Sequence, residues 1–296
     1  MGTLRENIYF EINEAINEEM GIASEVREES DRTIEKIKSI IAKKAEKGTI
    51  VSPGILKSDF NYADIIMGKK FRISVTYYNF LQRSTFERNI KDIWHNGATI
   101  TNSSQKVFFL NVKCYGISGT IDTASMADSV YHELSHLFQG ISGNKEAIDF
   151  DEKYSIAATK IFSNNEAERN VARLYYFSRR FEGDGYVNGL YGYLKNLDSP
   201  IPSYAELEKT EEFTAIKEFR ETITIISEGI KKPEYNAFCK KNFGITINKL
   251  LKIAFTSYYR FMRNLGRILI KVRQDKIDEG ISFKLTSDGN LSPLIF

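Results

Sequence analysis

Two of the three histidines in this 296-residue chain stand four positions apart around a glutamate, in the run His132-Glu133-Leu134-Ser135-His136. Positions four apart on a helix project from the same face, so both imidazoles can reach one metal ion. Glu133 lies beside them, where its carboxylate can take a proton from a water molecule on that ion. The alternative interpretation is a pair of ordinary surface histidines on an amphipathic helix.

The order H-E-x-x-H on a helix is typical of zinc peptidases, because it supplies two ligands and a general base within one turn. A catalytic zinc site needs a third protein ligand and an open position for water. No histidine follows His136, so the third ligand is expected to be a carboxylate or the upstream His95. The metzincin continuation is excluded, since Gln139 and Ser142 occupy its required places.

Two candidate carboxylates, Glu166 and Glu168, lie on the next strongly helical segment. Other acids left open as the third ligand are Glu146, Asp149, Asp151 and Glu152. The segment Glu166-Ala-Glu-Arg-Asn170, taken with the H-E-x-x-H run, resembles the gluzincin branch of the zincin metallopeptidases. Its details are most similar to the intracellular peptidases that cleave phage-type repressors.

The resemblance implies a zinc ion held by His132, His136 and Glu166, with Glu133 as the general base of peptide hydrolysis. A tetrahedral intermediate also needs a donor for its oxyanion. We expect Tyr176 in this role, because it lies ten residues after Glu166 and so on nearly the same helical face. The candidates that the sequence does not separate from it are Tyr131, Tyr154, Tyr175, Arg173 and His95.

Apolar spacing predicts the elements that carry these residues. The helices are expected at 25–47, 122–140, 164 to a glycine-rich turn at 183–185, 203–230 and 246–277, and the strands at 71–80 and 107–115. The strand at 107–115 precedes the histidine helix, where zincins commonly present a sheet edge that pairs with an extended substrate. The alternative is a core strand with Phe108, Leu110 and Val112 pointing inward.

We therefore expect an α+β, zincin-like fold, in which a small twisted sheet lies beside the active-site helix and the carboxy-terminal half is mainly helical. The expected division is an amino-terminal helical segment at 1–48, a catalytic core at 49–200 and a helical region at 201–296. The expected substrate is a peptide or protein, and the expected oligomeric state stays open.

Charge is nearly balanced over the whole chain, with 41 basic and 39 acidic residues, and there are only two cysteines. This balance does not favour a nucleic-acid or membrane partner, and the cysteine count excludes a disulfide framework. The section 231–276 is strongly basic, however. An alternative function is therefore a non-hydrolytic zincin-fold protein that binds a macromolecule through this region. No secretory signal is apparent, so we expect a cytoplasmic protein, encoded by a bacterium or a phage.

Overall fold

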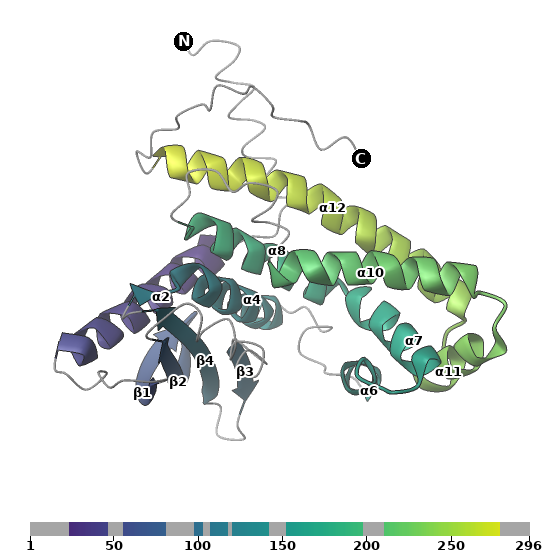
Figure 1. Cartoon of the computed structure of the whole chain (residues 1–296), viewed down its shortest axis with the longest axis horizontal. Helices are drawn as coiled ribbons and strands as arrows, with labels where there is room; N and C mark the ends of the chain where they lie inside the picture. Colours follow the sequence, from purple (N-terminus) through teal and green to yellow (C-terminus); the bar gives the residue numbers. More distant parts are fainter. Residues whose placement is uncertain are drawn as a thin grey trace, which may run out of the picture.

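A computed structural model describes residues 24–46, 56–80, 98–102, 107–117, 120–141, 152–197 and 210–278. Within them the chain is a mixed α+β structure in which helices predominate (Figure 1). The amino-terminal half supplies helix α2 (Ser24–Glu46), the strands and helix α4 (Thr123–Ile141). The helices that follow are α6 (Glu152–Lys160), α7 (Glu166–Phe177), α8 (Arg180–Lys195), α10 (Glu211–Glu228), α11 (Pro233–Phe243) and α12 (Ile247–Asp278).

The sheet has the order β1-β2-β4-β3, with a short β5 paired to β4. Its strands are β1 (Leu56–Ile66), β2 (Lys69–Phe80), β3 (Ala98–Asn102), β4 (Phe108–Ile117) and β5 (Thr120–Ile121). β1 and β2 form an antiparallel hairpin, and β2 and β4 are parallel. The two-residue turn of the hairpin has Met67 at φ 49° and Gly68 at φ 69°, a left-handed pair that matches the twist of the strands.

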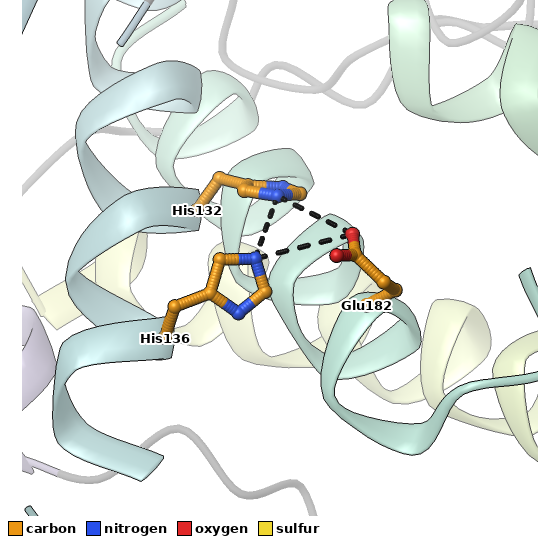
Figure 2. Close-up of side chains that lie close together, drawn as sticks. All are labelled: His132, His136 and Glu182. Carbon is orange, nitrogen blue, oxygen red and sulfur yellow. Dashed lines mark hydrogen bonds and ion pairs between the residues drawn. The ribbon is translucent and has the colours of Figure 1, made fainter. Parts of the chain in front are cut away.

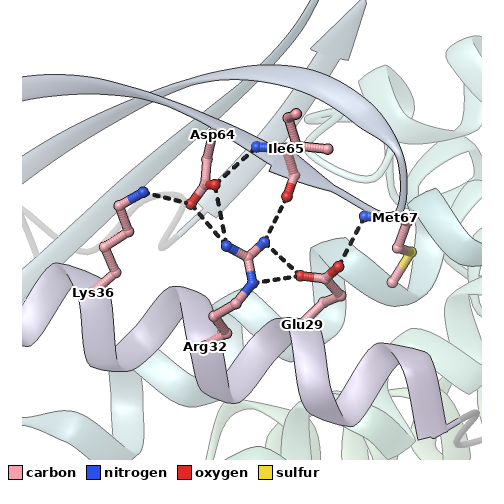
Figure 3. A network of polar contacts seen from close by, with 6 residues as sticks. All are labelled: Glu29, Arg32, Lys36, Asp64, Ile65 and Met67. Carbon is pink, nitrogen blue, oxygen red and sulfur yellow. Dashed lines mark hydrogen bonds and ion pairs between the residues drawn. The ribbon is translucent and has the colours of Figure 1, made fainter.

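Helix α2 is fastened to this hairpin by a network of charged side chains (Figure 3). Arg32 donates to both carboxylate oxygens of Asp64, at 3.1 and 3.2 Å, and Lys36 donates to Asp64 at 2.9 Å. Glu29 binds Arg32 and also accepts the backbone N–H of Met67 at 3.1 Å. The network thus satisfies the backbone of the turn and fixes the position of α2 over the end of β1.

The described residues pack into two hydrophobic clusters. The larger joins α2, the sheet, α4, α8, the first part of α10 and part of α12, with Val75, Leu110, Val130 and Leu134 fully buried. The smaller joins α6, α7, α10, α11 and the first half of α12. Helix α12 runs along one side of the molecule across α8 and α10 and contributes to both clusters (Figure 1).

Several elements confirm the predictions from sequence. The helices expected at 25–47, 122–140 and 246–277 are present as α2, α4 and α12 within one or two residues. The strand expected at 107–115 is present as β4, and its core-strand interpretation is confirmed because Leu110 and Val112 are buried. The edge-strand interpretation is wrong for the first half of β4, which lies between β2 and β3.

One prediction about the helices is wrong in a way that matters for the site. The glycine-rich turn expected at 183–185 is part of the continuous helix α8, and the preceding helix α7 ends at Phe177. The structure also contains elements that the sequence does not predict, namely β1, β3, β5, α6 and α11. The expected helix at 203–230 is seen from Glu211, and residues 201–209 lie outside the described part. Among the described residues, no helix combines the length and apolarity needed to cross a membrane.

Candidate metal centre

Helix α4 positions the two histidines. Asp122 accepts the backbone N–H of Ser125 at 3.0 Å and so caps the first turn. Met126, Val130 and Leu134 are buried on one face and anchor the helix in the larger cluster. His132 and His136 lie on another face, with side chains 18% and 21% exposed, and their Nε2 atoms are 3.0 Å apart. Both rings therefore present the same nitrogen to one point.

A carboxylate from helix α8 completes the cluster (Figure 2). Glu182 lies in the first turn of α8, and its side chain is only 2% exposed. Its Oε2 atom lies 3.9 Å from the Nε2 of His132 and 3.9 Å from the Nε2 of His136. This oxygen is buried without a hydrogen-bond partner, an arrangement that is costly unless a cation or proton donor compensates it.

The three atoms fit a metal ion of the size of zinc. The Oε2 atom of Glu182 and the two histidine Nε2 atoms form a triangle, with two N–O distances of 3.9 Å and one N–N distance of 3.0 Å. The point equidistant from the three atoms lies about 2.1 Å from each, within the range of zinc bonds to imidazole and carboxylate. Burial, together with the neighbouring imidazole of His136, lowers the pKa of His132 well below its usual value. Neutral imidazole is the form that binds a metal. Among the described residues, this is the cluster of histidine and acidic side chains that could hold an ion.

The second oxygen of Glu182 is held by a tyrosine from one of the helices that precede α8. The hydroxyl of Tyr154, on α6, donates to Oε1 at 2.5 Å. The ring of Tyr176, on α7, stacks on that of Tyr154 with centroids 5.5 Å apart. Burial and the charge of Glu182 raise the pKa of both phenols, so both stay protonated and can donate. The carboxylate is thus fixed through Oε1, while Oε2 faces the histidines.

Helix α8 can approach the histidines because its residue opposite them is a glycine. A Cβ atom on Gly185 would lie 3.0 Å from the Cε1 of His132 and 3.0 Å from the Cε1 of His136, closer than side chains normally pack. The next residue, Tyr186, places its ring edge-on to His132 with centroids 5.0 Å apart. The glycine therefore makes room for the imidazoles, and the tyrosine limits how His132 can turn.

A chain of polar side chains connects His136 to helix α12. The Nδ1 of His136 lies 3.5 Å from the Oε1 of Gln139, and the amide of Gln139 donates to Asp184 at 3.4 Å. Arg260, on α12, binds the other oxygen of Asp184 at 2.6 Å. If Nδ1 carries the proton, it donates to Gln139, and the lone pair of Nε2 then faces Glu182 and the shared point.

The carboxylate that lies beside the histidines differs from the one expected from sequence. Glu166, expected in that position, is an exposed residue at the start of α7 and is not a member of the cluster. Glu168 is also elsewhere: it binds Lys160 at 2.7 Å and Ser163 at 2.9 Å. The physical reason is the break between α7 and α8. It ends the first helix before the histidines and lets the second begin beside them, with Glu182 in its first turn.

The remaining sequence candidates have different outcomes. Tyr176 does lie at the site, where it interacts with Glu182, so the structure supports a role in positioning that carboxylate. Its expected role as oxyanion donor stays a prediction. Glu133 is half-buried on α4, between the two histidines in sequence. His95, Glu146, Asp149 and Asp151 lie outside the described residues, as does the side chain of Glu152.

Glu182 is not identifiable from the sequence analysis above, because Gly183 and Gly185 predict a turn at this point. A signal for the helix was present, since Val187, Leu190 and Leu194 follow helical spacing and all three are buried. Extending that helix back through the glycines would have placed Glu182 in its first turn. Nothing in the sequence shows that the first turn of α8 faces α4.

Comparisons with protein-family models, with curated proteins and with solved structures found no match to this chain. The candidate metal centre is therefore defined by its own geometry: two imidazole nitrogens and one buried, unpartnered carboxylate oxygen that converge from two helices. This is a donor set of the kind that holds catalytic zinc.

Proposed function

We propose that this protein is a zinc-dependent metallopeptidase, in which His132, His136 and Glu182 hold the metal and Glu133 is the general base. The observation that carries the proposal is the buried Oε2 of Glu182, which has no hydrogen-bond partner and lies at equal distance from the two Nε2 atoms. Two histidines and one glutamate leave the fourth position of a tetrahedral ion open, as catalytic sites require.

A zinc ion at this point would lower the pKa of a water molecule toward about 7 and polarise the carbonyl of the bond to be cleaved. Glu133 would take the proton of the attacking water and deliver it to the leaving amine. Glu133 follows His132 on α4 and is half-buried, so its side chain is not sealed from solvent. Tyr154 and Tyr176 would keep Glu182 in the geometry of a ligand.

The arrangement of elements supports a zincin-like, and within it a gluzincin-like, assignment. The histidine helix α4 packs against β3 and β4, and the glutamate ligand comes from a helix later in the chain. This is the order of parts that the resemblance in the sequence implies, with Glu182 in place of Glu166. The substrate edge of the sheet would then be β3 rather than β4, because β3 is the outer strand on that side.

Digestion of a peptide library derived from a whole proteome tests the proposal. The full chain, purified and supplied with zinc, is expected to cleave the library, and a chelator is expected to stop cleavage. Glu133→Gln should still bind zinc while cleavage falls by at least about a hundredfold, the contribution of a general base. Zinc-bound wild type that cleaves no peptide would overturn the proposal, and full activity in Glu133→Gln would remove Glu133 from its role.

A second candidate is a non-hydrolytic zincin-fold protein that binds a macromolecule. It is favoured by the outer face of α12, where Phe255 and Tyr259 are 43% and 69% exposed and Lys249, Lys252 and Arg263 are also exposed. Aromatic and basic side chains on one helix suit a nucleic-acid partner. Zinc binding without cleavage, together with steeply salt-dependent binding to generic DNA, would favour this candidate.

A further inference from the structure

A polar line of four side chains, Arg260, Asp184, Gln139 and His136, runs from helix α12 to the candidate metal centre. Arg260 binds the Oδ1 atom of Asp184 at 2.6 Å, and the two side chains are 30% and 17% exposed. The other oxygen of Asp184 lies 3.4 Å from the amide nitrogen of Gln139. The Oε1 atom of Gln139 lies 3.5 Å from the Nδ1 of His136. A helix that supplies no residue to the metal cluster is thus connected to one of its histidines.

Charge fixes the direction of each hydrogen bond in the polar line. A guanidinium group only donates hydrogen bonds, and an ionised carboxylate only accepts them. Asp184 accepts from Arg260 through one oxygen and must also accept through the other, so the group of Gln139 that faces it is the NH2 group. The carbonyl oxygen of Gln139 is then the atom that faces His136. The opposite orientation of this amide would place its oxygen against an oxygen of Asp184, which is unfavourable.

The same reasoning reaches the imidazole of His136. A neutral imidazole has one N–H group and one bare nitrogen, and an acceptor oxygen beside Nδ1 selects the tautomer with the hydrogen on Nδ1. The Nε2 of His136 is then bare, and this is the atom that lies 3.9 Å from the Oε2 of Glu182 (Figure 2). The hydrogen bond from Nδ1 also makes Nε2 more basic, and hence a stronger metal ligand.

We infer that Arg260 is a positioning residue of the metal centre, which holds His136 in the tautomer that binds a metal through Nε2. It acts through the other two members of the polar line, Asp184 and Gln139. The inference rests on the proposed function, because it concerns the affinity of the proposed zinc site. It gives α12 a part in that site although the helix supplies no ligand.

Asp184→Asn tests the direction of the polar line by exchanging one oxygen for an NH2 group of nearly the same size. Arg260 would hold the oxygen of the new amide, so the NH2 group would face Gln139 and turn the amide of Gln139 round. The NH2 group of Gln139 would then face Nδ1 of His136 and favour the hydrogen on Nε2. We expect the zinc affinity of the full chain to fall by about tenfold or more, measured by competition with a chelator of known affinity.

A second substitution separates a directed line from a merely structural role. When Arg260→Met is added to Asp184→Asn, the new amide is no longer held by the guanidinium and can turn its oxygen toward Gln139, which restores the original direction. The double variant should therefore bind zinc more tightly than Asp184→Asn alone. Arg263→Met is the matched control, because Arg263 is exposed on the same helix, and it should not restore affinity to Asp184→Asn. Unchanged affinity in Asp184→Asn, or no gain in the double variant, would overturn the inference.

NMR of the zinc-free protein separates this inference from the proposed function. At a pH of about 8, where an ordinary histidine is neutral, the nitrogen chemical shifts of an imidazole report which nitrogen carries the hydrogen. We expect it on Nδ1 of His136 in wild type and on Nε2 in Asp184→Asn. The same tautomer in both proteins would refute the polar line and leave the zinc site standing. The expected tautomers in a protein that binds no zinc would refute the metal centre and leave the polar line standing.

Discussion

The carboxylate of Glu182 has two oxygens with different tasks. Oε1 accepts the hydroxyl of Tyr154, which fixes the orientation of the group, and Oε2 is left without a partner inside the protein. An ionised carboxylate only accepts hydrogen bonds, so a buried oxygen of this kind calls for a cation. The two histidine nitrogens at 3.9 Å complete the set of donors that a zinc ion requires.

The hydrogen bond from Tyr154 to Glu182 leads to a prediction for zinc binding. Tyr154→Phe should weaken zinc binding by about ten- to a hundredfold, because Glu182 would lose the partner that holds it toward the histidines. Competition with a chelator of known affinity measures the change. Tyr235→Phe is the matched control, since Tyr235 is a buried tyrosine of α11 whose hydroxyl has no partner. Equal zinc affinity in Tyr154→Phe and wild type would contradict the positioning role.

Part of the site is predictable from the residues alone. His132 and His136 are only four positions apart, so a helix is sufficient to bring them together, and the sequence predicts that helix. Glu182 is distant in sequence, and its place depends on how α8 packs against α4. No local pattern contains that information, which is why Glu166, at the start of a more obvious helix, was the sequence expectation.

At the scale of elements, the site depends on the close contact between α4 and α8. Gly185 permits this contact, because any side chain there would meet the rings of both histidines. Gly183, two positions earlier on the same helix, has open space where a Cβ atom would lie. The two glycines therefore form a matched pair for testing the contact.

Gly185→Ala is expected to weaken zinc binding and to destabilise the protein, because the new methyl group must push the imidazoles or α8 aside. Gly183→Ala should be neutral or stabilise the protein by up to about 1 kcal/mol, since alanine favours the helix. Chemical denaturation and zinc titration of both variants measure these effects. Equal behaviour of Gly185→Ala and Gly183→Ala in both measurements would contradict the role of Gly185 in this contact.

The attachment of α2 to the β1–β2 hairpin predicts a pH dependence. Burial alone would raise the pKa of Asp64, but hydrogen bonds from Lys36, Ile65 and Arg32 outweigh it, and the pKa lies below its usual value (Figure 3). Asp64 is therefore ionised in the folded protein at a pH where it is protonated in the unfolded chain. Its contribution to stability is full above a pH of about 4 and is lost as the pH falls through the lowered pKa.

Asp64→Asn should accordingly lower the free energy of unfolding at neutral pH, and its difference from wild type should shrink as the pH falls below about 4. Urea denaturation across this range measures the difference. Glu35→Gln serves as the control, because Glu35 is 68% exposed and pairs with Lys38 on its own helix. A difference between Asp64→Asn and wild type that is constant with pH would contradict the role given to this carboxylate.

The elements themselves were predictable to different degrees. Apolar spacing is continuous in α2, α4 and α12, and all three lie where the sequence predicts them. Helix α8 contains glycines at 183, 185, 189 and 192, residues that usually mark turns. Here Gly185 serves close packing instead, and a single sequence does not distinguish a glycine that ends a helix from one that lets another helix approach.

At the scale of the whole molecule, the candidate metal centre lies where the two hydrophobic clusters meet. The histidines stand on α4, which belongs to the larger cluster, and the partners of Glu182 include Tyr176, which packs against the smaller one. Helix α8, whose apolar residues pack in the larger cluster, carries the glutamate. A metal ion at this junction would link both parts of the described structure.

The central claim is that zinc binds here with Glu182, not Glu166, as its third protein ligand. Zinc titration by calorimetry, with metal content measured after dialysis, tests it most directly on three proteins: wild type, Glu182→Gln and Glu166→Gln. The account predicts one zinc per chain for wild type and for Glu166→Gln with the same affinity, and a loss of at least about a hundredfold for Glu182→Gln. Unchanged affinity in Glu182→Gln, or a loss confined to Glu166→Gln, would contradict it.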